Sequence, residues 1–283
     1  MIAFHSDDYG INVNQALRIL DCRKHGCLNS VSIMPNSAHL DKTIPLLDDG
    51  CKKNIHINLV EGPCCAAPSE IPLLVQSGVF CHSFGSLMLL SLRRRAELEH
   101  QVETECLAQI RRVTQFLGPD YKLRIDSHVH YHMIPAVFRA LCRACAASGL
   151  EVEYIRYPTE LLTAYLRTPS VWPYIRPVNL LKTLVLKILG IWNRSTLHKY
   201  NYQHKTGDFF GVMFTGKMSE NCVIPILNAY EKHSKRHSLP LELLFHPGGI
   251  EPDEEFLTGS HNCDYYMSPD RKMEANTLKH LAR

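Results

Sequence analysis

Residues 2–34 read IAFHSDDYGINVNQALRILDCRKHGCLNSVSIM and contain one complete strand–helix–strand repeat. The apolar residues 2–5 predict a buried strand, and residues 30–34 predict the next one. Between them, residues 16–24 carry apolar side chains at helical spacing, and Gly26 closes the helix. Two strands joined through a helix lie parallel in one sheet, with a right-handed crossover. The repeat therefore predicts an α/β protein built on a parallel sheet.

The same alternation continues as far as residue 245. Further strands are expected at residues 55–59, 123–125, 152–156, 209–214 and 241–245, and further helices at residues 40–47, 93–117 and 136–148. About seven parallel strands, with no linker rich in proline, glycine or serine, predict a single domain over residues 1–283 in the form of an irregular (β/α) barrel. The first turn has no G-x-G-x-x-G, and no P-loop motif occurs, which removes the usual dinucleotide and P-loop sites.

The composition is that of a globular protein, with 45% hydrophobic and 21% charged residues. A net charge of +3 is too small to mark a nucleic-acid binder, so we expect no such partner. The eleven cysteines are odd in number and follow no regular spacing, which favours free thiols in a reducing compartment. Because the first residues lack the basic and apolar regions of a signal peptide, we expect a cytoplasmic protein.

Residues 180–192 form the most apolar later segment. They include Lys182 and Lys187 and are too few to span a bilayer, so we expect no integral membrane segment. The segment is expected to be an amphipathic helix that packs against the core or against a partner subunit, which leaves a homodimer open. Binding to a membrane surface is the alternative.

Polar residues stand at the ends of six of the seven predicted strands. They are Asp7 and Asp8, Asn36, His56 and Glu61, the histidines of residues 128–132, Arg156, and His246. In a parallel barrel, the carboxyl ends of all strands meet at one face, which is where such folds place their active sites. We therefore expect these side chains to share one site.

The histidine cluster strengthens the prediction of a metal site. His128, His130 and His132 alternate with other residues, so a strand-like backbone would send all three to one side. Imidazole and carboxylate are the ligands of catalytic zinc and similar ions, and three protein ligands leave a position for water. Asp8, His56 and one histidine of the cluster would make such a set. A neighbouring carboxylate could then act as general base, and a histidine such as His246 could donate a proton.

Several motifs together resemble the YdjC-like family, which includes the ChbG-type deacetylases of chito-oligosaccharides. They are SDDYG at residues 6–10, HINLVEG at 56–62, DSHVHYHMIP at 126–135, RYPTE at 156–160 and HPG at 246–248. The resemblance implies an irregular (β/α) barrel, one divalent metal ion (magnesium or zinc) and hydrolysis of N-acetyl groups on an amino sugar or oligosaccharide. Residues 163–205 match no motif of the family.

The resemblance also implies roles for single residues. It makes Asp8, His56 and His128 the metal ligands, Asp7 the catalytic base and His246 the proton donor. The family usually has alanine and phenylalanine where this chain has Ser6 and Tyr9. The remaining candidates are expected to face the substrate: Tyr9, Asn36, Glu61, His130, His132 and Arg156. For Glu61 the alternative is a turn cap, and for His130 and His132 it is a place beside the metal ligands without contact to substrate. For Arg156 the alternatives are orientation of Asp7 and a structural salt bridge.

Two other functions remain open at this point. A metal-dependent phosphoesterase uses similar clusters of histidine and aspartate, commonly with two metal ions about 3.5–4 Å apart. A non-catalytic carbohydrate- or metal-binding protein on the same fold is the second. The set of Asp7, Asp8, His56 and His128 favours an enzyme, because a binding protein has no need of a base beside a metal.

Overall fold

The structure is a computed structural model that describes residues 2–260 and 262–281. Within this part of the chain, one seven-stranded sheet has the order β7-β6-β3-β2-β1-β9-β8, and all of its neighbouring strands pair in parallel. The strands are β1 (Ile2–Tyr9), β2 (Ser30–Ile33), β3 (Lys52–Ile57), β6 (Leu123–Ser127), β7 (Val152–Ile155), β8 (Asp208–Phe210) and β9 (Leu241–Phe245). The prediction of about seven parallel strands is confirmed.

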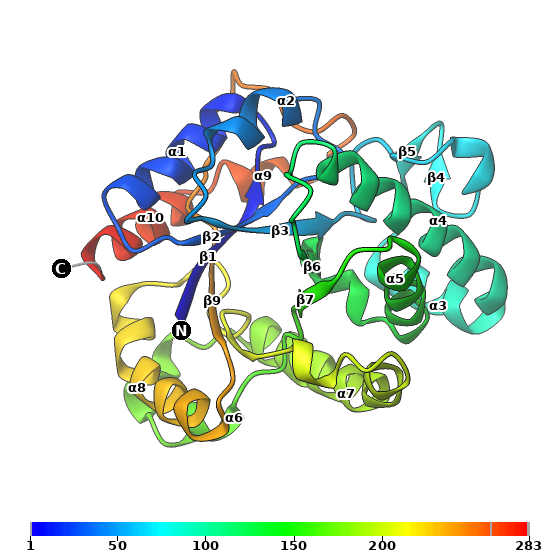
Figure 1. Cartoon of the computed structure of the whole chain (residues 1–283). Coiled ribbons are helices and arrows are strands. Elements are labelled where there is room, and N and C mark those ends of the chain that lie inside the picture. Colours follow the sequence, from blue (N-terminus) through cyan, green and yellow to red (C-terminus); the bar gives the residue numbers. More distant parts are fainter. Residues whose placement is uncertain (1, 261, 282–283) are drawn as a thin grey trace.

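The sheet is curled, and helices surround it (Figure 1). Its edge strands β7 and β8 are not paired with each other in the described residues, so the barrel is incomplete. A separate two-stranded antiparallel hairpin joins β4 (Val75–Gln76) to β5 (Val79–Phe80). The longer helices are α1 (Val13–Lys24), α3 (Phe84–Arg93), α4 (Arg95–Thr114), α5 (Pro135–Ala147), α7 (Pro177–Lys199), α8 (Glu220–His237) and α10 (Asp270–His280), and the short ones are α2 (Leu40–Thr43), α6 (Leu162–Leu166) and α9 (Cys263–Tyr266).

The helix predicted at residues 93–117 is confirmed as α4 (Arg95–Thr114). Helix α3 precedes it and was not predicted; Arg94 separates the two because it leaves the helical region with φ −132° and ψ 44°. Residues 163–205, which match no family motif, contain α7 and most of α6.

Strand β1 is longer than predicted, and its end is irregular. It runs through both aspartates to Tyr9, and its register against β2 shifts between Ser6 and Tyr9. Asp8 has φ +63° and Gly10 has φ +89°. Neighbouring side chains of a regular strand point to opposite faces. The left-handed backbone at Asp8 breaks this alternation, which lets Asp7 and Asp8 line the same cavity.

The strand-like backbone expected for the histidine cluster is a second correction. His128–Met133 forms a 3-10 segment, and Val129 and His130 have φ +51° and +58°. The three histidines therefore leave the backbone in different directions and do not form one row.

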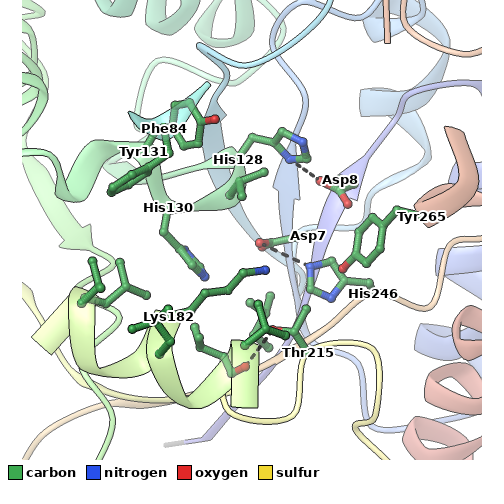
Figure 2. Close-up of a pocket in the computed structure, with 17 residues that line it drawn as sticks. Asp7, Asp8, Phe84, His128, His130, Tyr131, Lys182, Thr215, His246 and Tyr265 are labelled. Carbon is green, nitrogen blue, oxygen red and sulfur yellow. Dashed lines mark hydrogen bonds and ion pairs between the residues drawn. The ribbon is translucent and has the colours of Figure 1, made fainter. Parts of the chain in front are cut away.

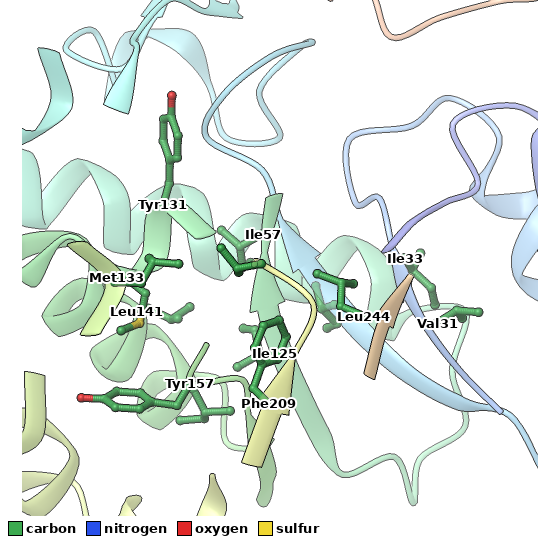
Figure 3. Close-up of a cluster of buried hydrophobic side chains, with 14 of the residues drawn as sticks. Val31, Ile33, Ile57, Ile125, Tyr131, Met133, Leu141, Tyr157, Phe209 and Leu244 are labelled. Atoms are coloured by element: carbon green, nitrogen blue, oxygen red, sulfur yellow. The ribbon is translucent and has the colours of Figure 1, made fainter. Parts of the chain in front are cut away.

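The core lies between the sheet and its surrounding helices. Figure 3 shows Ile57, Ile125 and Leu244 of the sheet beside Met133 and Tyr157, all of them buried. All eleven cysteines are free thiols. In the described ranges, none of the helices combines the length and the apolar character that a membrane span requires.

Candidate active site

A cavity of about 420 Å³ opens at the carboxyl ends of the central strands. Figure 2 shows Asp7, Asp8, His128 and His246 gathered on its polar side. Three strand ends supply these residues: β1 the two aspartates, β6 the backbone that runs into His128, and β9 the backbone that runs into His246. The shared site expected from the strand ends therefore forms for these four residues.

Three of the predicted ligands form a compact buried group beside the cavity. Asp8, His56 and His128 each offer a ligand atom, and these atoms lie within 4.8 Å of one another. Asp8 Oδ1 is 2.9 Å from His128 Nδ1 and 3.4 Å from His56 Nε2. Asp8 Oδ2 and His56 Nε2 are buried and have no hydrogen-bond partner in the described residues. Because buried polar atoms are rarely left without a partner, this donor set fits a divalent cation.

A second carboxylate orients His56. Asp126 accepts a hydrogen bond from His56 Nδ1 (2.6 Å) and further bonds from Ser32 Oγ (2.5 Å) and Asn54 Nδ2 (2.8 Å). The Nδ1 contact leaves the Nε2 atom of His56 for the site, as in carboxylate–histidine–metal arrangements. Asp126 belongs to the motif at residues 126–135, but its role could not be predicted from the motif.

The electrostatics of the group favour a positive charge. Burial alone would lower the pKa of His56, but Asp7 and Asp126 outweigh it and raise that pKa to about 10. Burial likewise opposes the charged form of His128, yet Asp8 raises its pKa to about 9. The surrounding carboxylates thus stabilise added positive charge, whether it is carried by a proton or by a metal ion.

Asp7 lies beside this group but has different partners. Its two carboxylate oxygens bind Arg156 Nη2 and Nη1 at 2.8 and 2.9 Å, and His5 Nε2 lies 3.3 Å away. Burial would raise the pKa of Asp7, but the charges of Arg156 and His56 and the bond from His5 hold it well below its usual range. Asp7 is therefore ionised, and it also lies 3.8 Å from His56 Nε2.

A competing group of His5, Asp7 and Asp126 also has ligand atoms within 4.8 Å of one another. Here the guanidinium of Arg156 already neutralises both carboxylates, since its Nη2 lies 2.8 Å from Asp7 and 3.0 Å from Asp126. A cation at that position would meet a fixed positive charge. The group that contains Asp8 is the better metal site.

His246 approaches Asp7 from the end of β9. Its Nε2 atom is 4.0 Å from Asp7 Oδ2, and its ring packs edge-on against Tyr265 (Figure 2). On the other side of the ring, Nδ1 lies 3.8 Å from Glu274 Oε2 of α10 and has no hydrogen-bond partner in the described residues. This imidazole faces the cavity between two carboxylates, a position suited to holding and delivering a proton.

A family model described as YdjC-like protein matches residues 1–282. The chain belongs to the YdjC-like family. A carbohydrate deacetylase of Danio rerio is 22% identical over 297 residues, which cover 96% of this chain and 90% of that protein. A chitooligosaccharide deacetylase of Proteus mirabilis (strain HI4320) is 27% identical over 165 residues, 55% of this chain and 59% of that protein.

The fold of this YdjC-like protein also resembles a solved structure. A protein of Enterococcus faecalis V583 described as a putative cellobiose-phosphate cleavage protein superposes with a TM-score of 0.63 at 16% identity. The match covers 98% of this chain and 90% of that chain. The irregular barrel implied by the family resemblance is thus confirmed at the level of the fold.

Arg156 does not face the substrate cavity in this YdjC-like protein. It is completely buried and binds Glu242 through Nε (2.5 Å) in addition to Asp7 and Asp126. The expectation that Arg156 contacts substrate is therefore corrected, and the alternative that it orients Asp7 agrees with the geometry. In the same motif, buried Glu160 accepts backbone hydrogen bonds after β8, from Gly211 among others.

Three other substrate candidates lie away from the cavity. Tyr9 is buried, and its hydroxyl donates to the carbonyl oxygen of Thr43 (2.7 Å). Asn36 donates to the carbonyl oxygens of Glu61 and Pro63. His132 is buried too, and both of its ring nitrogens have partners: Ser127 Oγ (2.6 Å) and the carbonyl oxygen of Arg156 (2.9 Å). Because their polar atoms bind within the protein, we correct the expectation that Tyr9 and Asn36 contact substrate. The contacts of His132 agree with the alternative, a supporting place beside the site.

Glu61 and His130 have different positions. Glu61 is buried and lies 3.2 Å from His128 Nε2, while it accepts hydrogen bonds from the hydroxyls of Tyr266 (2.6 Å) and Ser260 (2.7 Å). It therefore fixes the ring of His128 and does not point into the cavity. His130 does line the cavity, and burial, with the charge of Arg156, holds its pKa well below the usual range.

The wall of the cavity opposite the aspartates could not be predicted from the motifs. Helix α7 supplies Val178, Leu181, Val185 and Leu186 to this wall, together with Lys182, which points into the cavity in Figure 2. These residues belong to no family motif. The only signal in the sequence was the apolar, lysine-containing pattern of the helix, which gave no hint of which face would meet the site.

Proposed function

We propose that this YdjC-like protein is a metal-dependent carbohydrate N-deacetylase that hydrolyses the acetamide of an amino sugar or oligosaccharide. The observation that carries the proposal is the buried group of Asp8, His56 and His128, which has Asp7 and His246 beside it on the same cavity. The deacetylases of Danio rerio and Proteus mirabilis support the substrate class, since both are named for the deacetylation of carbohydrates.

Asp8, His56 and His128 would hold the divalent ion, magnesium or zinc, through one atom each. When bound, such an ion polarises the amide carbonyl and lowers the pKa of water. Asp126 and Glu61 keep the two imidazoles in their orientations.

Asp7 acts as the general base. Arg156 and His5 hold its carboxylate ionised and aimed at the site, so it can take a proton from the attacking water. Attack on the acetamide carbon gives a tetrahedral intermediate, and cleavage of its C–N bond releases acetate. His246, which lies between Asp7 and Glu274 at the edge of the cavity, delivers a proton to the departing amine.

A two-metal phosphoesterase fits the same residues less well. It would need a second cation near Asp7 and Asp126, where the Arg156 guanidinium already neutralises both carboxylates. A non-catalytic binding protein would not need an ionised Asp7 beside the metal group.

Mass spectrometry of acetate release from a panel of N-acetylated sugars, with metal-supplemented protein, tests the proposal. We expect acetate and the free amine in equal amounts from at least one substrate, and no phosphate release from the matching sugar phosphates. Phosphate release without acetate release from any member of the panel would contradict the proposal.

A further inference from the structure

Helix α7 (Pro177–Lys199) lies at the periphery of the fold (Figure 1). Large apolar side chains are exposed along it. The exposed side chains form a surface that we term the α7 stripe: Leu180, Leu181, Leu184, Ile188, Ile191 and Trp192. Steps of three and four residues link Leu181, Leu184, Ile188 and Ile191, so they share one face of the helix. Ile188 and Trp192 are 50% and 59% exposed, values that are unusual for a contiguous row of large apolar residues.

The opposite face of α7 is the one that meets the protein, and it is partly polar. Asn179, Thr183 and Asn193 are all buried there. Asn193 Nδ2 donates to the carbonyl oxygen of Met133 (2.8 Å), and Asn179 Nδ2 donates to those of Met213 and Thr215 (both 3.3 Å). In water, a surface helix normally turns its apolar face to the core. Helix α7 is apolar on both faces, since Leu186, Leu189 and Leu197 are buried on its inner side. Its outer apolar row has no cover in the described residues, which indicates that this face meets an apolar phase.

The charges around the stripe are of one sign. Residues 161–207 contain seven lysines and arginines and no aspartate or glutamate, whereas the rest of the chain has 24 basic and 28 acidic residues. In the described part of the chain, none of the seven cations forms an ion pair. Lys182, Lys187 and Arg194 belong to α7 itself. Both tryptophans of the chain, Trp172 and Trp192, also lie in this segment and are more than half exposed.

We propose that the α7 stripe docks on an anionic lipid surface. Apolar side chains and tryptophan flanked by lysine and arginine are the composition of helices that lie in the membrane interface. The uncompensated positive charge is complementary to acidic headgroups. A second copy of this chain is a poorer occupant, because a two-fold interface would bring the same unpaired cations of both copies together.

Docking would hold the cavity against the lipid surface. Val178 and Leu181 are 54% and 62% exposed and also line the cavity, so the outer face of α7 continues into its wall. Lys182 lies on the same wall. The mouth of the site therefore opens beside the proposed lipid contact. Docking of this kind determines where the protein works and does not depend on which reaction the site performs.

Cosedimentation of the full chain with vesicles tests the proposal. We expect the wild-type protein to bind vesicles of phosphatidylcholine with phosphatidylglycerol at least tenfold more tightly than vesicles of phosphatidylcholine alone. The double variant Leu184→Glu/Ile188→Glu changes exposed residues that do not line the cavity, and it should bind at least tenfold more weakly. The matched control Leu92→Glu/Ile224→Glu adds the same charges at exposed apolar positions of α3 and α8, and it should bind like the wild type.

Fluorescence gives an independent readout at the surface itself. In Trp172→Phe, Trp192 is the only remaining tryptophan of the chain, so its emission should shift to the blue when anionic vesicles are added. Wild-type protein that stays in the supernatant with anionic vesicles, or an unshifted emission of Trp192, would overturn the proposal. It would also be overturned if Leu184→Glu/Ile188→Glu bound vesicles as tightly as the wild type. A third contrary result would be a wild-type protein that forms a dimer and does not bind vesicles, with the same variant monomeric.

Discussion

Arg156 binds both carboxylate oxygens of Asp7 beneath the cavity floor, Nη1 to Oδ2 at 2.9 Å and Nη2 to Oδ1 at 2.8 Å. Among the described residues, the adjacent Asp8 has no bidentate partner of this kind: Arg271 Nη1 lies 3.9 Å from its Oδ2, and its Oδ1 turns toward His56 and His128. Two consecutive aspartates thus have distinct surroundings. Asp7 is bound by a guanidinium at hydrogen-bond distance, whereas the guanidinium nearest Asp8 stays 3.9 Å away and Asp8 Oδ2 has no hydrogen-bond partner in the described residues. This difference is the physical basis for assigning Asp7 as base and Asp8 as ligand.

Replacing Arg156 tests its role as a positioning residue. Arg156→Met leaves Asp7, Asp126 and Glu242 buried without their shared cation, so the free energy of unfolding in urea should fall by about 3–5 kcal/mol. Arg156→Lys keeps the charge but loses the two-pronged geometry. It should lower kcat with little change in KM, and it should move the acidic limb of the kcat/KM profile to higher pH, because the pKa of Asp7 rises.

The control for Arg156 is Arg143→Lys, whose guanidinium binds Glu99 and Glu103 of α4 away from the cavity. That variant should leave the pH profile unchanged. If Arg156 had a purely structural role, the acidic limb of the kcat/KM profile of Arg156→Lys would lie at the same pH as that of the wild-type protein.

The metal ligands can be tested by metal content. In Asp8→Asn, the asparagine tolerates the left-handed backbone at this position but lacks the charge of the ligand. The purified variant should therefore contain less than one metal ion per chain by plasma mass spectrometry. Asp126→Asn should bind metal roughly 10–100-fold more weakly, since it loses the carboxylate that orients His56. Stoichiometric metal in Asp8→Asn would remove Asp8 from the ligand set.

The proposed proton donor can be tested through the leaving group. His246→Gln should lose about 10²–10⁴-fold in kcat on an N-acetylated sugar, whose amine must be protonated as it departs. On an aryl acetate ester, whose leaving group departs as a stable anion, the same variant should lose far less. Equal losses on both substrates would mean that His246 does not act by protonating the leaving group.

His132 should make the protein sensitive to mild acid. Burial lowers its pKa to about 4, whereas an exposed histidine in the unfolded chain titrates near 6.5. Between these values, only the unfolded chain binds this proton, so the contribution of His132 to the free energy of unfolding falls as the pH drops from 6.5 to 4. The effect should amount to roughly 1–3 kcal/mol.

Urea unfolding in the presence of a chelator, which excludes metal release, measures this pH dependence. His132→Gln has no proton to gain and should show a flatter dependence over the same interval. An identical slope for the variant and the wild-type protein would contradict the assignment of a buried neutral imidazole.

The parallel sheet and the polar strand ends could be predicted because they depend on local patterns. Apolar runs predict strands, and a parallel sheet brings their carboxyl ends to one face, so Asp7, Asp8, His56, His246 and the histidine cluster of residues 128–132 could be located from the strand pattern. The choice of His128 within the cluster came from the family resemblance. The direction in which each side chain points depends on backbone angles that the pattern does not contain. The positive φ of Val129 and His130 is the example: it disperses a row of histidines that an extended strand would have aligned.

The carboxylates that orient the histidines of the site could not be predicted from the sequence either. Asp126, Glu61 and Glu274 act through contacts with residues far along the chain, 70 positions away for Asp126 and 28 for Glu274, which no local spacing reveals. The same holds for α7, whose amphipathic pattern predicted a helix. The pattern could not show which apolar residues would turn inward: Leu186 and Leu189 are buried, whereas Ile188 and Trp192 stay exposed.

The most direct test of the division between base and ligand is to measure metal content and acetate release together in Asp7→Asn, on a substrate found with the wild-type protein. Because Asp7 is bound by Arg156 and lies outside the ligand group, the variant should retain one metal ion per chain while its rate falls by about 10²–10⁴-fold. Near-normal turnover, or loss of the metal together with the activity, would contradict the division of roles between Asp7 and Asp8.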